Sequence, residues 1–285
     1  MKDCRIGVVG AAGRMGRLLL RLAATTPGFR LVGGSERKGA SDIGKDLGQL
    51  AGIEPLGLAL GEDAKKIFAA ADAVLDFTTP EASLAHARLA AASGKAHVIG
   101  TTGIDAAGRN ALADAAKKAP IVFAPNMSLG VNLLAELVTQ VARSLDPAWD
   151  IEIVEMHHRH KVDAPSGTAL LFGRAAASGR GVDLDKVAER GRDGVTGARK
   201  PGAIGFAALR GGDVVGEHSV IFAGEGERLE LTHKATSRDI FARGAFAAAR
   251  WAAGRKPGLY SMKDVLGFLA ADSQALGHQP GQDQS

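Results

Sequence analysis

The sequence predicts an α/β protein in which a doubly wound parallel sheet is followed by a mixed α+β region. Two observations support this fold class. Over residues 4–124, short apolar runs alternate with helical segments, as they do where crossover helices join parallel strands. After residue 128, strand-like runs separated by glycine turns become frequent, which is typical of a mixed sheet in a second domain.

The first region contains predicted strands and helices in alternation. We expect strands at 4–9, 29–33, 73–77, 96–99 and 121–124, and helices at 17–24, 80–92 and 105–118. Each strand is a short apolar run bounded by turn residues, as buried strands usually are. Because crossovers between parallel strands are right-handed, the helices should cover both faces of the sheet. No regular pattern places the elements of residues 38–72.

The second region has a different element order. We expect helices at 131–144 and 168–177, and strands at 150–156, 204–210, 218–223 and 228–233. The segment 190–202 is rich in glycine and basic residues and is predicted to be a mobile loop. Alanine-rich helices are expected at 240–253 and 262–270, and the polar residues 273–285 are expected to form a disordered tail.

Composition argues against several classes of partner. Hydrophobic residues make up 46% of the 285 residues and charged residues 23%, which is ordinary for a folded soluble protein. The net charge of +4 is spread along the chain, so we expect no nucleic-acid partner. Cys4 is the only cysteine, which excludes an internal disulfide and favours the reducing cytoplasm. No apolar run approaches the ~20 residues that span a bilayer, so we expect no membrane partner.

A glycine turn at residues 10–16 joins the first strand to the first helix with the spacing G-x-x-G-x-x-G. Such a turn lets a pyrophosphate approach the backbone at a helix N-terminus. The candidate cofactor-binding residues in this turn are Gly10, Ala11, Ala12, Gly13, Arg14 and Met15. Glu36 follows the second strand, where an acidic residue usually binds the ribose hydroxyls of a dinucleotide. The alternative is a glycine turn that binds nothing.

The residue after Glu36 bears on the choice of dinucleotide. Glu36 suits a free 2′-hydroxyl, whereas Arg37 could bind a 2′-phosphate. Both NADH and NADPH are therefore candidate cofactors. The alternative is that Arg37 and Lys38 are solvated loop residues.

Two later turns also follow predicted strands, at the edge of a parallel sheet where ligands bind. The candidate cofactor-binding residues here are Gly100, Thr101, Thr102, Ala124, Pro125, Asn126 and Met127. We expect the first turn to line the nicotinamide side and the second to serve also as a hinge. A capping turn and a plain linker are the alternatives.

Residues 157–168 read HHRHKVDAPSGT, a basic run that leads into a predicted helix start. His157 and Lys161 are candidate proton donors, since histidine titrates near neutral pH. The backbone at Gly167 and Thr168 could bind a carboxylate of a small substrate. Strand alternation would place His158 on the opposite face from His157, so the strand must end or twist here if both contact substrate.

Other interpretations of the basic run remain. A metal site at His158 and His160 is not expected, because no cysteine and no evident third ligand accompany them. Binding of nucleic-acid phosphates is disfavoured, because aromatic residues are only 5% of the chain and none interrupts the run. A solvated edge strand would account for the basic residues, but not for the adjoining helix start.

Residues 155–169, EMHHRHKVDAPSGTA, resemble the signature of the 4-hydroxy-tetrahydrodipicolinate reductases, formerly called dihydrodipicolinate reductases. The resemblance extends to residues 10–16, 100–103, 204–206, 210–218 and 226–235, and so covers nearly the whole chain except its last residues. It implies a Rossmann-like dinucleotide-binding domain of residues 1–128 and 239–272. A substrate-binding and oligomerisation domain would comprise residues 129–238, in a cytoplasmic homotetramer.

The resemblance also implies a reaction. NADH or NADPH would reduce a cyclic imine dicarboxylate, formed by dehydration of 4-hydroxy-tetrahydrodipicolinate, to tetrahydrodipicolinate in lysine and diaminopimelate biosynthesis. By position, His157 and Lys161 resemble the catalytic proton donors, and His158, Gly167 and Thr168 resemble substrate-binding residues. The alternatives are another two-domain imine or semialdehyde dehydrogenase and a dinucleotide-binding regulator without catalysis. Neither the preferred cofactor nor the final proton donor follows from the sequence.

Overall fold

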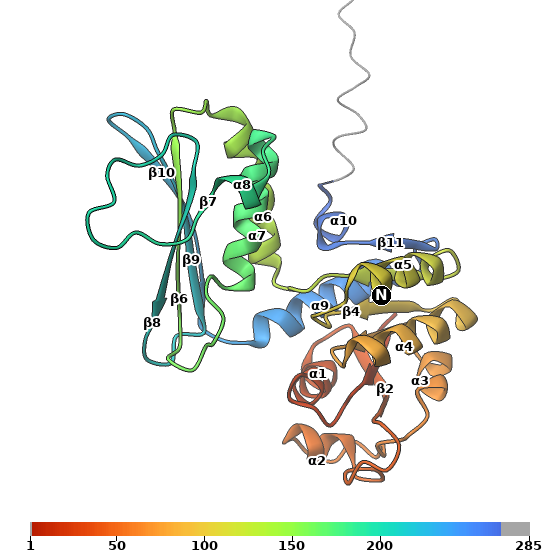
Figure 1. Ribbon diagram of the computed structural model, residues 1–285. Coiled ribbons are helices and arrows are strands. Elements are labelled where there is room, and N and C mark those ends of the chain that lie inside the picture. Colours follow the sequence, from red (N-terminus) through yellow and green to blue (C-terminus); the bar gives the residue numbers. More distant parts are fainter. Residues whose placement is uncertain (1, 269–285) are drawn as a thin grey trace, which may run out of the picture. The chain divides into compact units, whose positions relative to one another are not determined.

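The computed structural model describes residues 2–268 and divides into two compact units (Figure 1). Unit 1 combines the residues up to Ser128 with those from Phe241 onward, and unit 2 is Leu129–Ile240. Unit 1 contains a parallel sheet and unit 2 a mixed sheet, which confirms the predicted fold class. The tail predicted at 273–285 lies outside the described residues.

Unit 1 is built on a six-stranded sheet in the order β11-β5-β4-β3-β1-β2. Its strands are β1 (Cys4–Val9), β2 (Phe29–Ser35), β3 (Ala73–Asp76), β4 (Ala96–Ile99), β5 (Pro120–Phe123) and β11 (Gly258–Tyr260). Every neighbouring pair is parallel. The predicted strands all occur, whereas β11, only three residues long, was not predicted.

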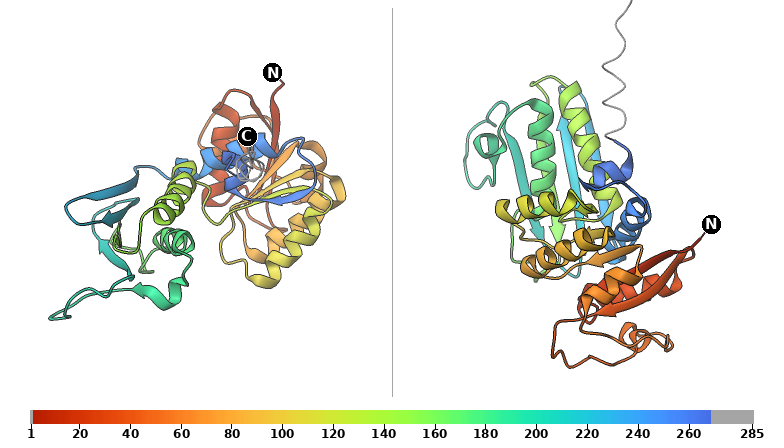
Figure 2. Two further views of the ribbon diagram at one scale, coloured as in Figure 1. Left: turned by 90° about the horizontal axis from the view of Figure 1, so that it is seen from above. Right: turned by 90° about the vertical axis from the view of Figure 1, so that its right-hand side faces the viewer.

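Helices cover both faces of this sheet, as the left-hand view of Figure 2 shows for α1 and for α4 and α5. The helices are α1 (Arg14–Thr25), α2 (Leu47–Ala51), α3 (Ala64–Ala70), α4 (Pro80–Ser93), α5 (Ala106–Ala116), α9 (Asp239–Ala252) and α10 (Met262–Leu266). The helix predicted at 262–270 is too long, because Gly267 adopts a left-handed conformation with φ 83° and ends it at Leu266. The last residues of that prediction lie outside the described residues.

Part of the segment that could not be placed from sequence, residues 46–58, is organised by one side chain. The Asp46 carboxylate accepts hydrogen bonds from the backbone N–H groups of Gly48 and Gln49, which cap α2, and from those of Leu56 and Leu58. A helix of five residues leaves no periodic apolar pattern to detect. A loop held by hydrogen bonds to one carboxylate therefore escaped prediction.

Unit 2 packs its helices on one face of a five-stranded sheet in the order β10-β9-β6-β8-β7 (Figure 1). The strands are β6 (Asp150–His157), β7 (Ala188–Glu189), β8 (Ile204–Arg210), β9 (Gly216–Ala223) and β10 (Arg228–Ala235); the helices are α6 (Leu129–Ser144), α7 (Gly167–Arg180) and α8 (Leu184–Val187). Strand β6 is parallel to β8 and antiparallel to β9. No helix or strand occurs between Glu189 and Ile204, the range that contains the predicted loop.

The alternation of β6 places its functional residues. Ile151 and Ile153 are buried in the core beneath the helices. Because alternate residues of a strand share a face, Glu155 and His157 continue this buried row, and both are buried. A single row thus passes from an apolar core to a pair of titratable side chains.

Helices α6 and α7 approach closely because α7 has a glycine at their contact. A Cβ atom at Gly179 would lie 2.4 Å from the backbone oxygen of Thr139. No side-chain rotation can relieve a contact with backbone, so any larger residue must separate the two helices.

We predict that Gly179→Ala lowers the thermal stability of the protein, measured as Tm. Overpacking costs about 1–3 kcal/mol, which exceeds the gain of up to about 1 kcal/mol in helix propensity. Ser178→Ala, at the exposed neighbouring position of α7, is the control and should leave Tm unchanged or slightly raised. A Gly179→Ala protein as stable as the wild type would contradict the close packing of α6 on α7.

Candidate active site

The centre of the candidate site in unit 2 is a buried pair, Glu155 and His157. The Oε2 atom of Glu155 lies 2.5 Å from Nδ1 of His157. Both oxygens of Glu155 also accept hydrogen bonds from Arg210, Oε2 from Nη1 and Oε1 from Nη2, each at 2.8 Å. The backbone N–H of Ser166 donates to Oε1 at 3.1 Å. Charge and hydrogen bonds therefore offset the burial of this carboxylate.

These contacts determine the protonation of the pair. Burial alone would raise the pKa of Glu155, but the hydrogen bonds from Arg210 and His157 outweigh it and hold this pKa below its usual value. Burial lowers the pKa of His157, although its hydrogen bond to Glu155 opposes the shift. An ionised Glu155 accepts only, so Nδ1 of His157 carries the proton and Nε2 is left to exchange one.

A second buried histidine supports the start of helix α7. Nε2 of His218 lies 2.9 Å from Oγ of Ser166, and this hydroxyl also accepts the backbone N–H of Ala169 as the N-cap of α7. Burial, followed by the positive charge of His157, lowers the pKa of His218 to about 4. His218 is therefore neutral at physiological pH and acts here as a hydrogen-bonding support.

The chain turns sharply after His157, where β6 ends. The N–H of His158 donates to the carbonyl of Val214 at 2.7 Å, and the N–H of Lys161 donates back to the carbonyl of His158 at 3.1 Å. This turn is the interruption that the sequence required if residues on both faces of the strand are to meet one substrate. His158 and His160 line a pocket together with the loop at Gly212.

Lys161 reaches the start of helix α7 through Asp163. Nζ of Lys161 lies 2.8 Å from Oδ1 of Asp163. Hydrogen bonds from Lys161 and from the backbone N–H of Gly167 contribute to holding the pKa of Asp163 below its usual value. The positive charge of Lys161 is also close enough to lower the pKa of His157. A proton donor, a cationic side chain and a helix start thus occupy one small region.

Several members of this cluster were missed from the sequence. Glu155 could have been found, because it lies two positions before His157 on the same strand face. Arg210 and His218 lie opposite β6 only through strand register, with His157 beside Arg210 and Glu155 beside His218. A single sequence contains no signal for that register.

In unit 1, the glycine turn lies at the carboxyl end of β1. Gly10 has a φ of +65°, and a Cβ atom there would meet Thr78 at 2.5 Å. A Cβ atom at Gly16 would lie 2.2 Å from the carbonyl oxygen of Gly10. Glu36 lies against the same turn, since its Oε2 accepts the N–H of Ala12 at 3.2 Å. Both positions therefore require glycine for close packing of the turn, and an acidic side chain lies against the turn, as in dinucleotide-binding folds.

The capping of helix α1 agrees with an anion at this turn. Its N-cap residue, Gly13, makes no side-chain cap hydrogen bond, and its first turn contains no acidic residue. Other helices of the unit are capped by side-chain oxygens, namely those of Asp46, Asp63, Thr79, Asp105 and Ser261. The first turn of α1 thus suits the phosphates of a dinucleotide.

The two later turns follow β4 and β5 at the same edge of the sheet. Gly100 packs against the ring of Phe77, which a Cβ atom would meet at 2.1 Å. Thr101 is buried with its hydroxyl 2.7 Å from that of Ser83, whereas Thr102 is exposed.

In the turn after β5, residues 124–127, the outer two residues are buried and the inner two are not. Ala124 and Met127 are buried, while Pro125 is exposed. The Asn126 side chain accepts the N–H of Ser128 at 2.9 Å. Some of the predicted cofactor-binding residues therefore have buried side chains. Thr101 and Met127 could contact a ligand chiefly through their backbone atoms.

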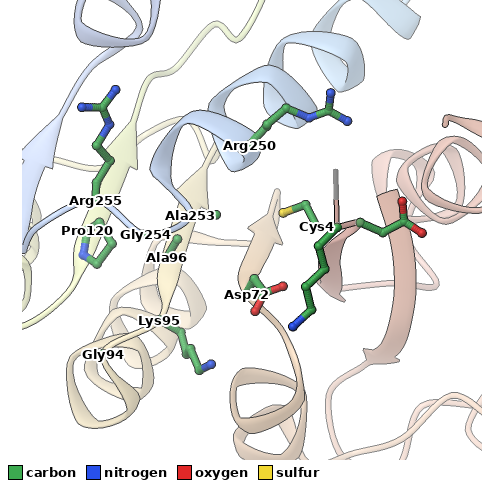
Figure 3. A pocket seen from close by; sticks show the side chains of 12 residues that line it. Cys4, Asp72, Gly94, Lys95, Ala96, Pro120, Arg250, Ala253, Gly254 and Arg255 are labelled. Atoms are coloured by element: carbon green, nitrogen blue, oxygen red, sulfur yellow. The ribbon is translucent and has the colours of Figure 1, made fainter. Parts of the chain in front are cut away.

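A pocket at the opposite edge of this sheet contains none of the predicted residues. It lies at the amino ends of the strands, beside Cys4, Asp72 and Pro120 (Figure 3). Because ligands of open α/β sheets bind at the carboxyl ends, the pocket is not a candidate for the cofactor.

Two further searches cover the part of the chain that the structure describes. Within residues 2–268, no helix is both long and apolar enough to cross a membrane. In the same residues, no group of three or more His, Cys, Asp or Glu side chains is arranged to hold a metal ion.

Comparison with known proteins matches nearly the whole chain. Residues 4–127 match the family model for the N-terminus of dihydrodipicolinate reductase, and residues 130–266 match the model for its C-terminus. The 4-hydroxy-tetrahydrodipicolinate reductase of Parvibaculum lavamentivorans is 60% identical over 267 residues, covering 93% of this chain and 98% of that protein. 4-Hydroxy-tetrahydrodipicolinate reductase 1 of Mesorhizobium japonicum is 59% identical with the same coverage.

A solved structure agrees with these matches. The dipicolinate-bound dihydrodipicolinate reductase of Paenisporosarcina sp. TG-14 is 25% identical with a TM-score of 0.74, covering 91% of this chain and 97% of that one. The resemblance seen in the sequence is thereby confirmed. This chain belongs to the dihydrodipicolinate reductase family, a family of nicotinamide-dependent oxidoreductases.

Proposed function

We propose that this enzyme uses NADH or NADPH to reduce the cyclic imine derived from 4-hydroxy-tetrahydrodipicolinate to tetrahydrodipicolinate, in lysine and diaminopimelate biosynthesis. Family membership supports the reaction. The observation that carries the proposal is the cluster of Glu155, His157 and Lys161 beside the start of helix α7. The imine gains a hydride and a proton, so the site must supply positive charge and a proton donor for a dianionic substrate.

The residues of unit 1 would hold the cofactor. When bound, the nicotinamide supplies the hydride. We assign the phosphates to the Gly10 turn and the first turn of α1, because no side chain caps this helix and its first turn contains no acidic residue. Glu36 would accept hydrogen bonds from the adenosine ribose, and exposed Arg37 would bind a 2′-phosphate if one is present.

The proton would come from His157 or Lys161. Glu155 holds the imidazole of His157 with Nε2 as the exchanging atom. Two substrate carboxylates nearby would raise the pKa of His157, opposing the effect of burial and favouring the imidazolium that donates. Lys161 would neutralise substrate charge and serve as the second donor.

The start of helix α7 would bind one carboxylate of the substrate. Asp163 accepts hydrogen bonds from Lys161 and from the Gly167 backbone, and this supports a carboxylate position at the helix start. A substrate carboxylate would compete with Asp163 for the same donors and be held by Gly167 and Thr168. His158, in the adjoining pocket, would contact the rest of the substrate.

We also propose that the enzyme is a cytoplasmic homotetramer, as the family resemblance implies. The face of the unit 2 sheet away from the helices carries Val154, Met156, Leu209 and Ile221. Leu209 is 51% exposed. The same face also carries Glu152, Glu217 and Ser219, so its apolar residues form only part of it. A mixed surface with an exposed apolar part suits contact with further copies of the chain.

We predict that His157→Ala lowers kcat by about 10²–10⁴-fold, the usual effect of losing a general acid. Lys161→Ala should have an effect of similar size, because it removes charge as well as a donor. The measurement is oxidation of NADH or NADPH by the condensation product of pyruvate and aspartate semialdehyde. Arg174→Ala is the control, because this basic side chain of α7 is exposed and takes no part in the cluster, and it should retain turnover within about threefold.

Two results of this assay would contradict the assignments. Near-normal turnover in both the His157 and Lys161 variants would show that the proton donors are wrong. A wild-type protein that binds the cofactor but never oxidises it would favour a regulator without catalysis.

We predict that His157 titrates below 6.5 in the free protein, because burial lowers its pKa, and that pyridine-2,6-dicarboxylate raises this value. If cationic His157 donates the proton, kcat/KM must fall as pH rises through the lower pKa. Histidine NMR titration measures both values, with the His157→Ala spectrum as the assignment control. A free-protein pKa above 6.5, or one unchanged by the dicarboxylate, would contradict this role.

We predict that Arg37→Ala raises KM for NADPH about tenfold or more and leaves KM for NADH nearly unchanged. Loss of a charge-assisted hydrogen bond to the 2′-phosphate is worth about 1.5–3 kcal/mol. Lys38→Ala, at the adjacent exposed position, is the matched control. Equal changes for the two cofactors would exclude Arg37 as the 2′-phosphate contact.

A further inference from the structure

A fully buried carboxylate lies at the carboxyl end of β3, where unit 1 carries its candidate cofactor turns. The side chain of Asp76 is 0% exposed. Its Oδ1 atom accepts three hydrogen bonds: from the N–H of Thr78 at 3.0 Å, from the hydroxyl of Thr78 at 2.6 Å and from the hydroxyl of Ser83 at 3.1 Å. This atom therefore orients Thr78, which lies between β3 and α4, and Ser83, which lies near the start of α4.

The other oxygen of Asp76 is held by two histidines. Oδ2 lies 2.8 Å from Nδ1 of His86 and 3.0 Å from Nε2 of His97. Burial alone would raise the pKa of Asp76, but the hydrogen bonds from His86 and His97 outweigh it and hold this pKa below its usual value. Burial lowers the pKa of His97, so this histidine is a neutral donor. Asp76 is thus an ionised group that can only accept.

The contacts of Asp76 lead to two cofactor turns. Because Asp76 only accepts, Ser83 donates its proton to the carboxylate and accepts one from Thr101, whose hydroxyl lies 2.7 Å away. On the other side, the methyl group of Thr78 lies only 2.5 Å from the position that a Cβ atom of Gly10 would take. One carboxylate therefore fixes the turn after β4 through Ser83 and packs Thr78 against the turn after β1.

We propose that Asp76 is a positioning residue for the nicotinamide cofactor, which it never touches, and that Ser83 transmits its effect. Turning the Thr101 hydroxyl inward leaves the backbone of this turn and the exposed Thr102 to face the ligand. Buried ionised groups cost several kcal/mol unless they are fully hydrogen-bonded. Apolar residues could fill this part of the core without the cost of a buried charge. The Asp76 network lies beside the turns at the carboxyl ends of the strands, where the cofactor would bind, and this location points to a role in ligand binding. The inference rests on the proposed function, since it assumes that a nicotinamide dinucleotide binds at these turns.

The test compares two serines of helix α4. Ser83→Ala breaks the connection between Asp76 and Thr101, and Ser93→Ala removes a hydroxyl that bonds only to carbonyls of its own helix. We expect Ser83→Ala to raise the Kd of NADH about 3–10-fold, while Ser93→Ala leaves it unchanged. Ser83→Thr keeps the hydroxyl and should restore much of the affinity. Asp76→Asn is a second variant and should weaken NADH binding at least as much as Ser83→Ala.

A role limited to folding predicts a different pattern. Binding of pyridine-2,6-dicarboxylate by Ser83→Ala should stay close to the wild-type value if the serine positions the cofactor. Tm should fall in either case, because the buried Asp76 carboxylate loses one of its hydrogen bonds, so the comparison of the two ligands separates the roles. An unchanged Kd for NADH in Ser83→Ala, or equal weakening of NADH and the dicarboxylate, would overturn the positioning role. Wild-type protein that binds neither NADH nor NADPH would instead overturn the proposed function itself.

Discussion

The candidate active site depends on the burial of one ionised carboxylate, Glu155. Leaving such a group without partners would cost several kcal/mol, so the surrounding strands and helix must supply them. Arg210 supplies charge from β8, Ser166 an N–H from the start of α7, and His157 a ring N–H from the same strand. The carboxylate thereby ties the end of β6, the end of β8 and the start of α7 to one point.

This constraint explains why the catalytic and binding candidates lie together. Regular alternation of β6 places Glu155 and His157 inward, and the strand ends at His157. The chain then turns through His158 to Lys161, toward the start of α7. In unit 1, Asp76 is buried in a similar way at the end of β3, with histidines and hydroxyls in place of a guanidinium. Each unit thus uses a buried acid to hold the backbone that would face its ligand.

The sequence predicted the parts of this arrangement that are local. Parallel strands, the glycine turn before α1 and the end of a strand at His157 each leave a pattern in neighbouring residues. Short elements leave no such pattern in the sequence, and neither do loops held by a single side chain. Examples are strand β11, helix α8 and helix α2 within segment 38–72. Arg210, His218 and the Asp76 network arise from strand register and crossovers, where residues far apart in the chain meet. The family resemblance supplied residue roles that spacing alone left open.

The proton-donating cluster of unit 2 is proposed to bind the dicarboxylate substrate. A crystal structure with a nicotinamide cofactor and pyridine-2,6-dicarboxylate tests it most directly. We expect one carboxylate on the backbone of Gly167 and Thr168, with Lys161 released from Asp163 to meet it and Nε2 of His157 facing the ring. A dicarboxylate bound away from these residues, with Lys161 still paired to Asp163, would contradict it.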